Sequence, residues 1–215
     1  MQRRALDAAN LSDTETYPNP PTDWGRAWRG AATAETLFAL AEAAGLAPQA
    51  TARAALAVAA HVRRFVEPGE PRPAEAYAAA MAMLEGRGDV AALEAAILAC
   101  DGATLGADVS TVASAAMGEA VRAVVGVEGS GRRAAKFAAR ASLMQIGFDR
   151  KAQARAEERR ADLVRVALPL AVVLTAATEP GRLDGAVPSG PRAVRDSGPL
   201  VTPSPGPIPF DARRA

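Results

Sequence analysis

Residues 109–125 read VSTVASAAMGEAVRAVV, and this stretch decides the fold that we expect. Its apolar side chains recur at helical spacing, so that Val112, Ala116, Ala120 and Val124 share one face of a helix. Because these side chains are small, neighbouring helices are able to approach that face closely. The stretch therefore predicts a helix that packs tightly against other helices.

The helical pattern extends from this stretch in both directions along the chain. Alanine, the best helix former, accounts for 54 of the 215 residues, whereas aromatic residues make up 4%. Thr33, Asp89, Asp149 and either Asp108 or Ser110 are suited to cap helix starts. Helices are expected at residues 33–44, 48–66, 72–85, 90–100, 109–125, 131–146 and 149–166, with a kinked continuation past Pro169 as an option.

These helices and the short loops between them predict an all-α fold. We expect a compact, alanine-rich antiparallel bundle of about six to seven helices. The bundle should occupy residues 31–178 as one helical domain.

Proline-rich segments lie on both sides of the expected domain. The sequence YPNPPTD at residues 17–23 does not support a helix, so residues 1–30 are expected to form an irregular N-terminal arm. Residues 180–215 contain eight prolines and several glycines. Because such a segment buries little apolar surface, residues 179–215 are expected to be a disordered tail, or an extended arm held by a partner or by the body itself.

The charge and hydropathy of the chain indicate the environment in which the protein is expected to occur. The formal net charge is +1, which gives no general attraction to nucleic acid. The longest apolar run, from Val166 to Thr178, is interrupted by Pro169 and is shorter than the about 20 residues that a membrane helix needs. No secretory signal follows the first residues. A soluble, cytoplasmic protein without a membrane span is therefore expected.

Single copies of histidine and cysteine limit the chemistry that the sequence predicts. His61 and Cys100 are too few for a zinc site or a histidine-assisted nucleophile, so no catalytic, metal or cofactor residues are expected. His61 is interpreted as a partly exposed helix residue rather than a general base. Asp101 would raise the pKa of the neighbouring Cys100 thiol, which favours a buried, unreactive cysteine.

An enzyme that works with carboxylates and arginines alone stays open as an alternative. Glu119 with Arg122, or Glu94, would be the groups to test, and a perturbed carboxylate pKa in a cleft would support it.

The sequence GVEGSGRR at residues 126–133 places glycines and arginines at the start of a helix, as phosphate loops do. It lacks the preceding strand and the spacing of known phosphate loops, so a turn between helices is the favoured interpretation. Arg132, Lys136 and Arg140 follow on one side of that helix, together with Arg133. They are suited to an acidic partner or to phosphates, or they form a solvated face.

Trp24 and Trp28 are spaced one helical turn apart beside arginines, a composition found at binding hot spots. The alternative, which we favour, is that both rings hold the N-terminal segment on the bundle. The candidate partner-binding residues are Trp24, Trp28, Arg63, Arg64, Arg132, Arg133, Lys136 and Arg140.

Residues 50–170 resemble a family of helical bacterial proteins described as immunity proteins. The resemblance is carried by AAHVRRFVE at 59–67, EPRPAEA at 70–76 and Glu85-Gly86, and the layout also fits EERRADL at 157–163. It implies a helical module that binds and neutralises a toxin or a similar protein target, and it supplies no catalytic residues.

Two hypotheses for function follow. The first is a non-enzymatic protein-binding module, with an immunity-like inhibitor as its sharpest form. The second is a structural subunit of a larger assembly, whether of its own copies or of other proteins, in which the Pro-rich terminal arms contact neighbours.

Overall fold

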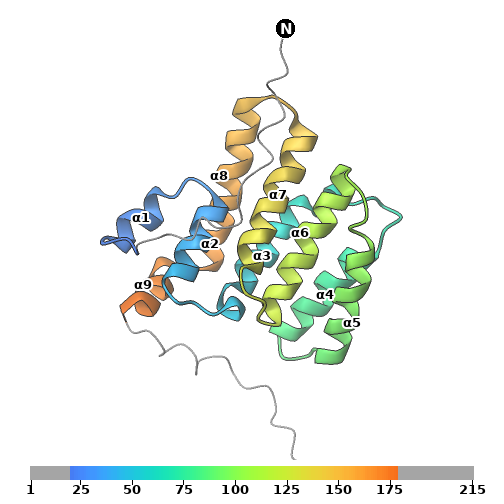
Figure 1. The fold of residues 1–215 in the computed structure, drawn as a ribbon, viewed down its shortest axis with the longest axis horizontal. Helices are drawn as coiled ribbons and strands as arrows, with labels where there is room; N and C mark the ends of the chain where they lie inside the picture. The colour runs from blue at the N-terminus through green and yellow to red at the C-terminus, as the bar shows by residue number, and fades with distance from the viewer. Residues whose placement is uncertain (1–19, 179–215) are drawn as a thin grey trace, which may run out of the picture.

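The computed structural model describes residues 20–178, which form nine α-helices and contain no β-strand (Figure 1). The helices are α1 (Trp24–Gly30), α2 (Ala34–Ala43), α3 (Pro48–Val62), α4 (Arg72–Leu84), α5 (Val90–Gly102), α6 (Val109–Val124), α7 (Ser130–Ile146), α8 (Arg150–Ala167) and α9 (Leu170–Thr178). A short 3₁₀ helix, η2 (Arg63–Phe65), extends α3. The all-α class is confirmed. The expected arm at 1–19 and tail at 179–215 lie outside the described residues.

Polar side chains at the helix starts explain most of these bounds. The side chains of Thr33, Asp89, Asp108 and Asp149 each accept hydrogen bonds from backbone amides in the first turn that follows. Such caps satisfy amides that have no partner inside the helix. The predicted caps are confirmed, and Asp108 rather than Ser110 caps α6.

Two additional helices correct the expected number of six to seven. Residues 24–30 were expected to be irregular, but Asp23 accepts a hydrogen bond from the Arg26 amide at 2.8 Å and starts α1 directly after the prolines. At the other end, Pro169 interrupts the chain, and α9 leaves α8 at an angle of 63°. Proline has no amide hydrogen to donate, so the helix cannot continue unbroken.

Within residues 20–178 no single helix is both long and apolar enough to cross a bilayer. The bent pair α8 and α9 meets those requirements jointly, by length and composition alone.

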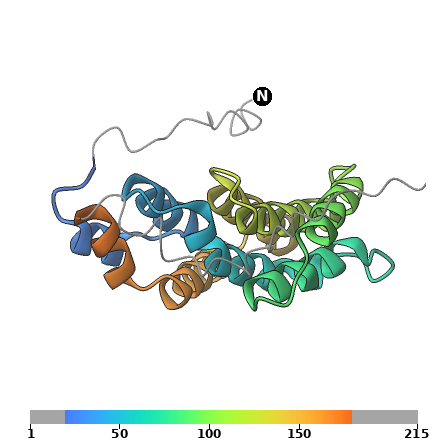
Figure 2. The ribbon, with the colours of Figure 1, turned by 90° about the horizontal axis from the view of Figure 1, so that it is seen from below.

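The helices stack in two layers, visible edge-on in Figure 2. One layer holds α2, α7 and α6, and the other holds α8, α3 and α4. Helix α3 packs on α6, α7 and α8, while α5 lies at one end against α4 and α6. Helices α1 and α9 contact each other at the opposite end (Figure 1).

The core is centred on α6, where 11 of 16 residues are buried. The predicted stripe of Val112, Ala116, Ala120 and Val124 is buried, and so are residues on the other sides of the helix, such as Met117. A helix surrounded in this way needs small side chains on several faces, because each neighbour must approach its backbone.

Gly131, in the first turn of α7, marks a close contact between α7 and α2. A Cβ atom at this position would lie 2.8 Å from Cδ1 of the Phe38 ring, and the ring is fully buried. The same Cβ would lie 3.4 Å from Oγ1 of Thr51 on α3. Glycine therefore sets the distance at which α7 meets α2 and α3.

We predict that Gly131→Ala lowers the free energy of unfolding by about 1–3 kcal/mol, because the added methyl group forces the Phe38 ring to move within a packed core. Gly30→Ala is the control. An added methyl at Gly30 meets open space, so its stability should be unchanged or raised by less than about 1 kcal/mol. Urea unfolding measures both, and equal stability of Gly131→Ala and the wild type would contradict the close contact.

Candidate functional site

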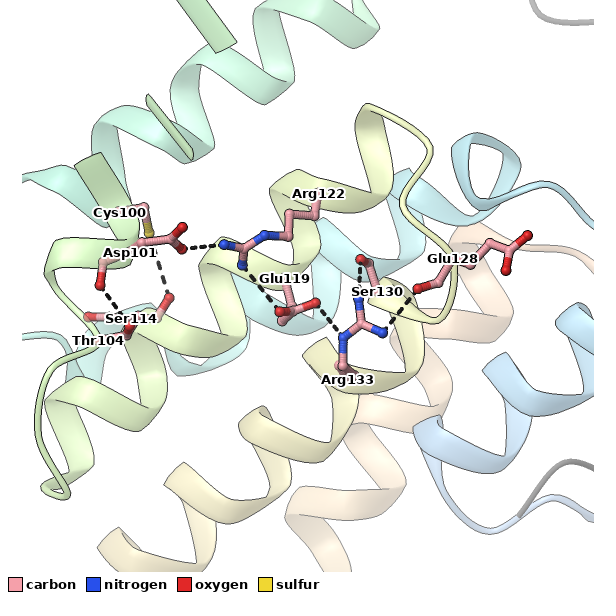
Figure 3. A network of polar contacts seen from close by, with 9 residues as sticks. All are labelled: Cys100, Asp101, Thr104, Ser114, Glu119, Arg122, Glu128, Ser130 and Arg133. Carbon is pink, nitrogen blue, oxygen red and sulfur yellow. Dashed lines mark hydrogen bonds and ion pairs between the residues drawn. The ribbon is translucent and has the colours of Figure 1, made fainter. Parts of the chain in front are cut away.

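A network of ion pairs joins α5, α6 and α7 (Figure 3). At its centre, Glu119 on α6 accepts a hydrogen bond from Nη1 of Arg122 at 3.1 Å and one from Nε of Arg133 at 2.8 Å. Arg122 also pairs with Asp101 at the end of α5. The Glu119 side chain is 14% exposed, so these pairs are partly shielded from water. The network holds three helices in register.

Arg133 also fixes the turn between α6 and α7. Its Nη1 donates to the Glu128 carbonyl oxygen at 3.0 Å, and its Nη2 donates to Oγ of Ser130 at 2.9 Å. Gly126 and Gly129 adopt positive φ angles of 87° and 69°, which other residues rarely do. These contacts favour the interpretation of the glycine-rich sequence as a turn between helices.

The ion pairs of Glu119 and Arg122 are relevant to the alternative of an enzyme that works with carboxylates and arginines alone. Both oxygens of Glu119 accept hydrogen bonds from guanidinium groups of the chain itself, and Arg122 is held between Glu119 and Asp101. Proton abstraction by Glu119 would require these bonds to break. The geometry therefore favours a role for the network in joining helices. Glu94 is exposed on α5, outside this network.

We predict that Glu119→Ala lowers the free energy of unfolding by about 1–3 kcal/mol, because Arg122 and Arg133 lose a shared, partly buried partner. The matched control is Glu94→Ala on exposed α5, which should stay within about 0.5 kcal/mol of the wild type. Chemical denaturation followed by circular dichroism compares the two. A loss no larger than that of the control would show that the network contributes little.

Cys100, next to this network, is fully buried, as predicted. Its Sγ donates a weak hydrogen bond to the Ser114 carbonyl oxygen at 3.8 Å. Burial, with a contribution from the charge of Asp101, raises the pKa of the thiol to about 11. The thiol is therefore protonated at neutral pH and is a poor nucleophile.

A second polar cluster, centred on Arg160 of α8, was not predicted from the sequence. Arg160 is 3% exposed, and its Nη1 donates to Oγ of Ser142 on α7 at 2.7 Å. Its Nη2 pairs with Glu157, whose other oxygen accepts the Ala34 amide at the start of α2 at 3.2 Å. The Nε atom has no hydrogen-bond partner within residues 20–178. The cluster ties α8 to α7 and α2.

The sequence contained a signal for this cluster. Arg160 is four residues after Ala156 and four before Val164, and both neighbours are buried on the inner face of α8. Helical periodicity alone places the arginine on the buried stripe.

His61 is half-buried on α3, in agreement with the prediction of a partly exposed helix residue. Burial lowers its pKa below the ordinary value, and the positive charges of Arg160, Arg64 and Arg159 lower it further. The folded protein therefore favours the neutral ring. The unfolded chain binds a proton at a higher pH than the folded protein does.

We predict that His61 makes stability depend on pH in the range around and below about pH 6.5. The stability that the neutral His61 ring contributes is fully present above the pKa that the ring has in the unfolded chain. This stability is lost as the pH falls through the lower pKa that the ring has in the folded protein. His61→Gln removes this term, so the variant should lose less stability than the wild type between about pH 7.5 and pH 5.5. Thermal unfolding at several pH values measures the slopes, and identical slopes would contradict the prediction.

The candidate partner-binding residues fall into separate places. Trp28 is buried in the core, so the structure removes it from the surface, and Trp24 is partly buried against the same core. Both lie on α1, at the end of the molecule opposite α5 (Figure 1). Their burial supports the interpretation that they hold the N-terminal helix on the bundle. Arg63 and Arg64 are exposed on η2, and the Arg64 guanidinium stacks 4.9 Å from the Phe65 ring centroid.

The four basic candidates on α7 do not act as one group. Arg132 pairs with Glu42 on α2 at 3.7 Å, and Arg133 belongs to the Glu119 network. Lys136 is half-buried, whereas Arg140 is exposed. Of the four, Arg140 is the most accessible to a partner.

Two exposed apolar surfaces were not identified from the sequence. One covers the outward side of α5 and the loop that follows, with Val90, Leu98 and Leu105. The other lies at the turn between α7 and α8, where Phe148 is fully exposed. The described residues contain no group of three or more His, Cys, Asp or Glu side chains suited to a metal ion.

Comparisons of this chain with protein-family models, curated proteins and solved structures give no match.

Proposed function

We propose that this chain is a non-enzymatic protein-binding module whose binding surface includes the outward side of α5. The observation that carries this proposal is that α5 is almost entirely apolar in composition but is mostly exposed. Only Glu94 and Asp101 are charged in this helix, yet only Leu93 and Cys100 are buried. A helix that is apolar on all sides is normally enclosed by other protein.

Exposed apolar side chains occur along the whole length of α5, and the exposed Glu94 lies among them. Leu98 is 72% exposed, Val90 lies at the start of the helix, and Leu105 follows its end. The alanines between them, at positions 91, 92, 95 and 99, are also exposed. Apolar surface of this extent on one helix is typical of sites where proteins bind one another.

The sharpest form of the proposal is an immunity-like protein that neutralises a toxin. It is supported by the family resemblance of residues 50–170, a range that contains α5. In this form the module binds its target stoichiometrically and blocks it by contact, which requires no catalytic group of its own.

The alternative is a structural subunit of a larger assembly. It is supported by the composition of residues 180–215, with eight prolines, which lie outside the described residues. A second copy of the chain covering α5 would also explain why this helix is apolar.

We predict that Leu98→Glu lowers recovery of a protein partner at least about tenfold, since a charge would enter the apolar centre of the interface. The bait is the tagged full-length chain in an extract of the cells that make it. Val166→Glu is the matched control, because Val166 is 81% exposed but lies on α8. Equal recovery by Leu98→Glu and the control, or no stoichiometric protein partner, would contradict the proposal.

Absolute mass by light scattering separates the two functions. The full-length chain and a chain ending at Glu179 should both be monomeric if the protein is a stand-alone binding module. A defined oligomer that depends on residues 180–215 would support the assembly function instead.

A further inference from the structure

The turn between α7 and α8 carries a second group of exposed apolar side chains. Leu143 and Met144 lie in the last turns of α7 and are each about half exposed, and Phe148 in the turn itself is fully exposed. Figure 1 shows this end of the two helices extending beyond the neighbouring helices at the top of the molecule. The apolar group therefore lies at a projecting tip of the fold, and much of its surface is left uncovered by the described residues.

Basic side chains surround this apolar group. Arg140 on α7 and Arg150, Lys151 and Arg155 on α8 are all exposed. Between residues 140 and 156 the only acidic side chain is Asp149, and its carboxylate accepts hydrogen bonds from the amides of Lys151 and Ala152 at 2.9 and 3.0 Å. The surface around Phe148 is thus positively charged.

We propose that this tip docks on an anionic lipid surface. Phe148, with Leu143 and Met144, enters the boundary between headgroups and acyl chains, while the basic side chains lie at the level of the anionic headgroups. Apolar side chains flanked by lysine and arginine are the combination that interfacial lipid binding requires. The contact is peripheral and involves no span of the bilayer.

The shape of the tip favours a bilayer over other anionic partners. A projecting group of three apolar side chains requires a partner that accepts them without a preformed pocket, and a bilayer does so. A nucleic acid would pair with the basic side chains but would leave Leu143 and Met144 without an apolar environment. The proposal does not depend on the function proposed for α5, because the two surfaces lie on different helices (Figure 1).

The test is co-sedimentation of the full-length chain with vesicles of phosphatidylcholine, with or without phosphatidylglycerol. Partition onto the anionic vesicles should exceed that onto neutral vesicles by at least about tenfold and should fall as salt is added. Phe148→Asp should lower this partition by about tenfold or more, because a charge replaces the inserted ring. Arg150→Glu combined with Lys151→Glu should lower it by more than about tenfold.

Control measurements keep the test interpretable. Phe148 is fully exposed, so its side chain does not contribute to the packed core. The circular dichroism spectrum and the thermal unfolding of Phe148→Asp should therefore match those of the wild type. Val166→Asp, an exposed apolar residue at the far end of α8, should bind anionic vesicles as the wild type does.

Three results would overturn the proposal. One is equal or absent binding to both kinds of vesicle. Another is that Phe148→Asp binds anionic vesicles fully while Arg150→Glu/Lys151→Glu loses binding. That result would indicate attraction to any polyanion, including nucleic acid. The third is loss of binding in Val166→Asp, which would place lipid contact at the junction of α8 and α9.

Discussion

Close packing around α6 is the constraint on which the rest of the structure depends. Helices α3, α4, α5 and α7 all contact it, so its backbone has almost no side that is free of protein. This arrangement requires small side chains on α6. The same requirement applies at Gly131, where α7 packs against α2. The cost is that alanines bury less apolar area than leucines, so each contact contributes less stability.

Two polar clusters add directional contacts between helices to this apolar packing. The Glu119 network fixes the ends of α5, α6 and α7, and the Arg160 cluster fixes α8 against α7 and the start of α2. Directional hydrogen bonds specify register in a way that interchangeable alanines do not. Both clusters are built from guanidinium groups, which form several bonds at once. In this protein arginine and carboxylate pairs add to the specificity that large buried side chains such as Phe38 and Met117 supply in the core.

Most helix bounds could be predicted from the sequence, whereas contacts between residues on different helices could not. Helix bounds depend on neighbours in the chain, so Thr33, Asp89 and Asp149 revealed them, while Asp23 was overlooked because the adjacent prolines dominated the pattern. The pairing of Arg122 with Asp101 joins residues on different helices and has no sequence spacing to reveal it. The exposure of α5 is likewise a result of how many helices are available to cover it. Composition predicted an apolar helix but not which side would remain uncovered.

The bend at Pro169 brings α9 back against α1, so the folded body begins and ends on the same side. The two helices nearest the chain ends therefore support one another, and neither is a free appendage. For protein engineering, this topology means that a reporter or surface tether joined directly to the start of α1 or to the end of α9 attaches to one edge of the molecule. The outward side of α5 and the α7–α8 turn then face away from the attachment point, which allows the protein to be immobilised with both surfaces accessible.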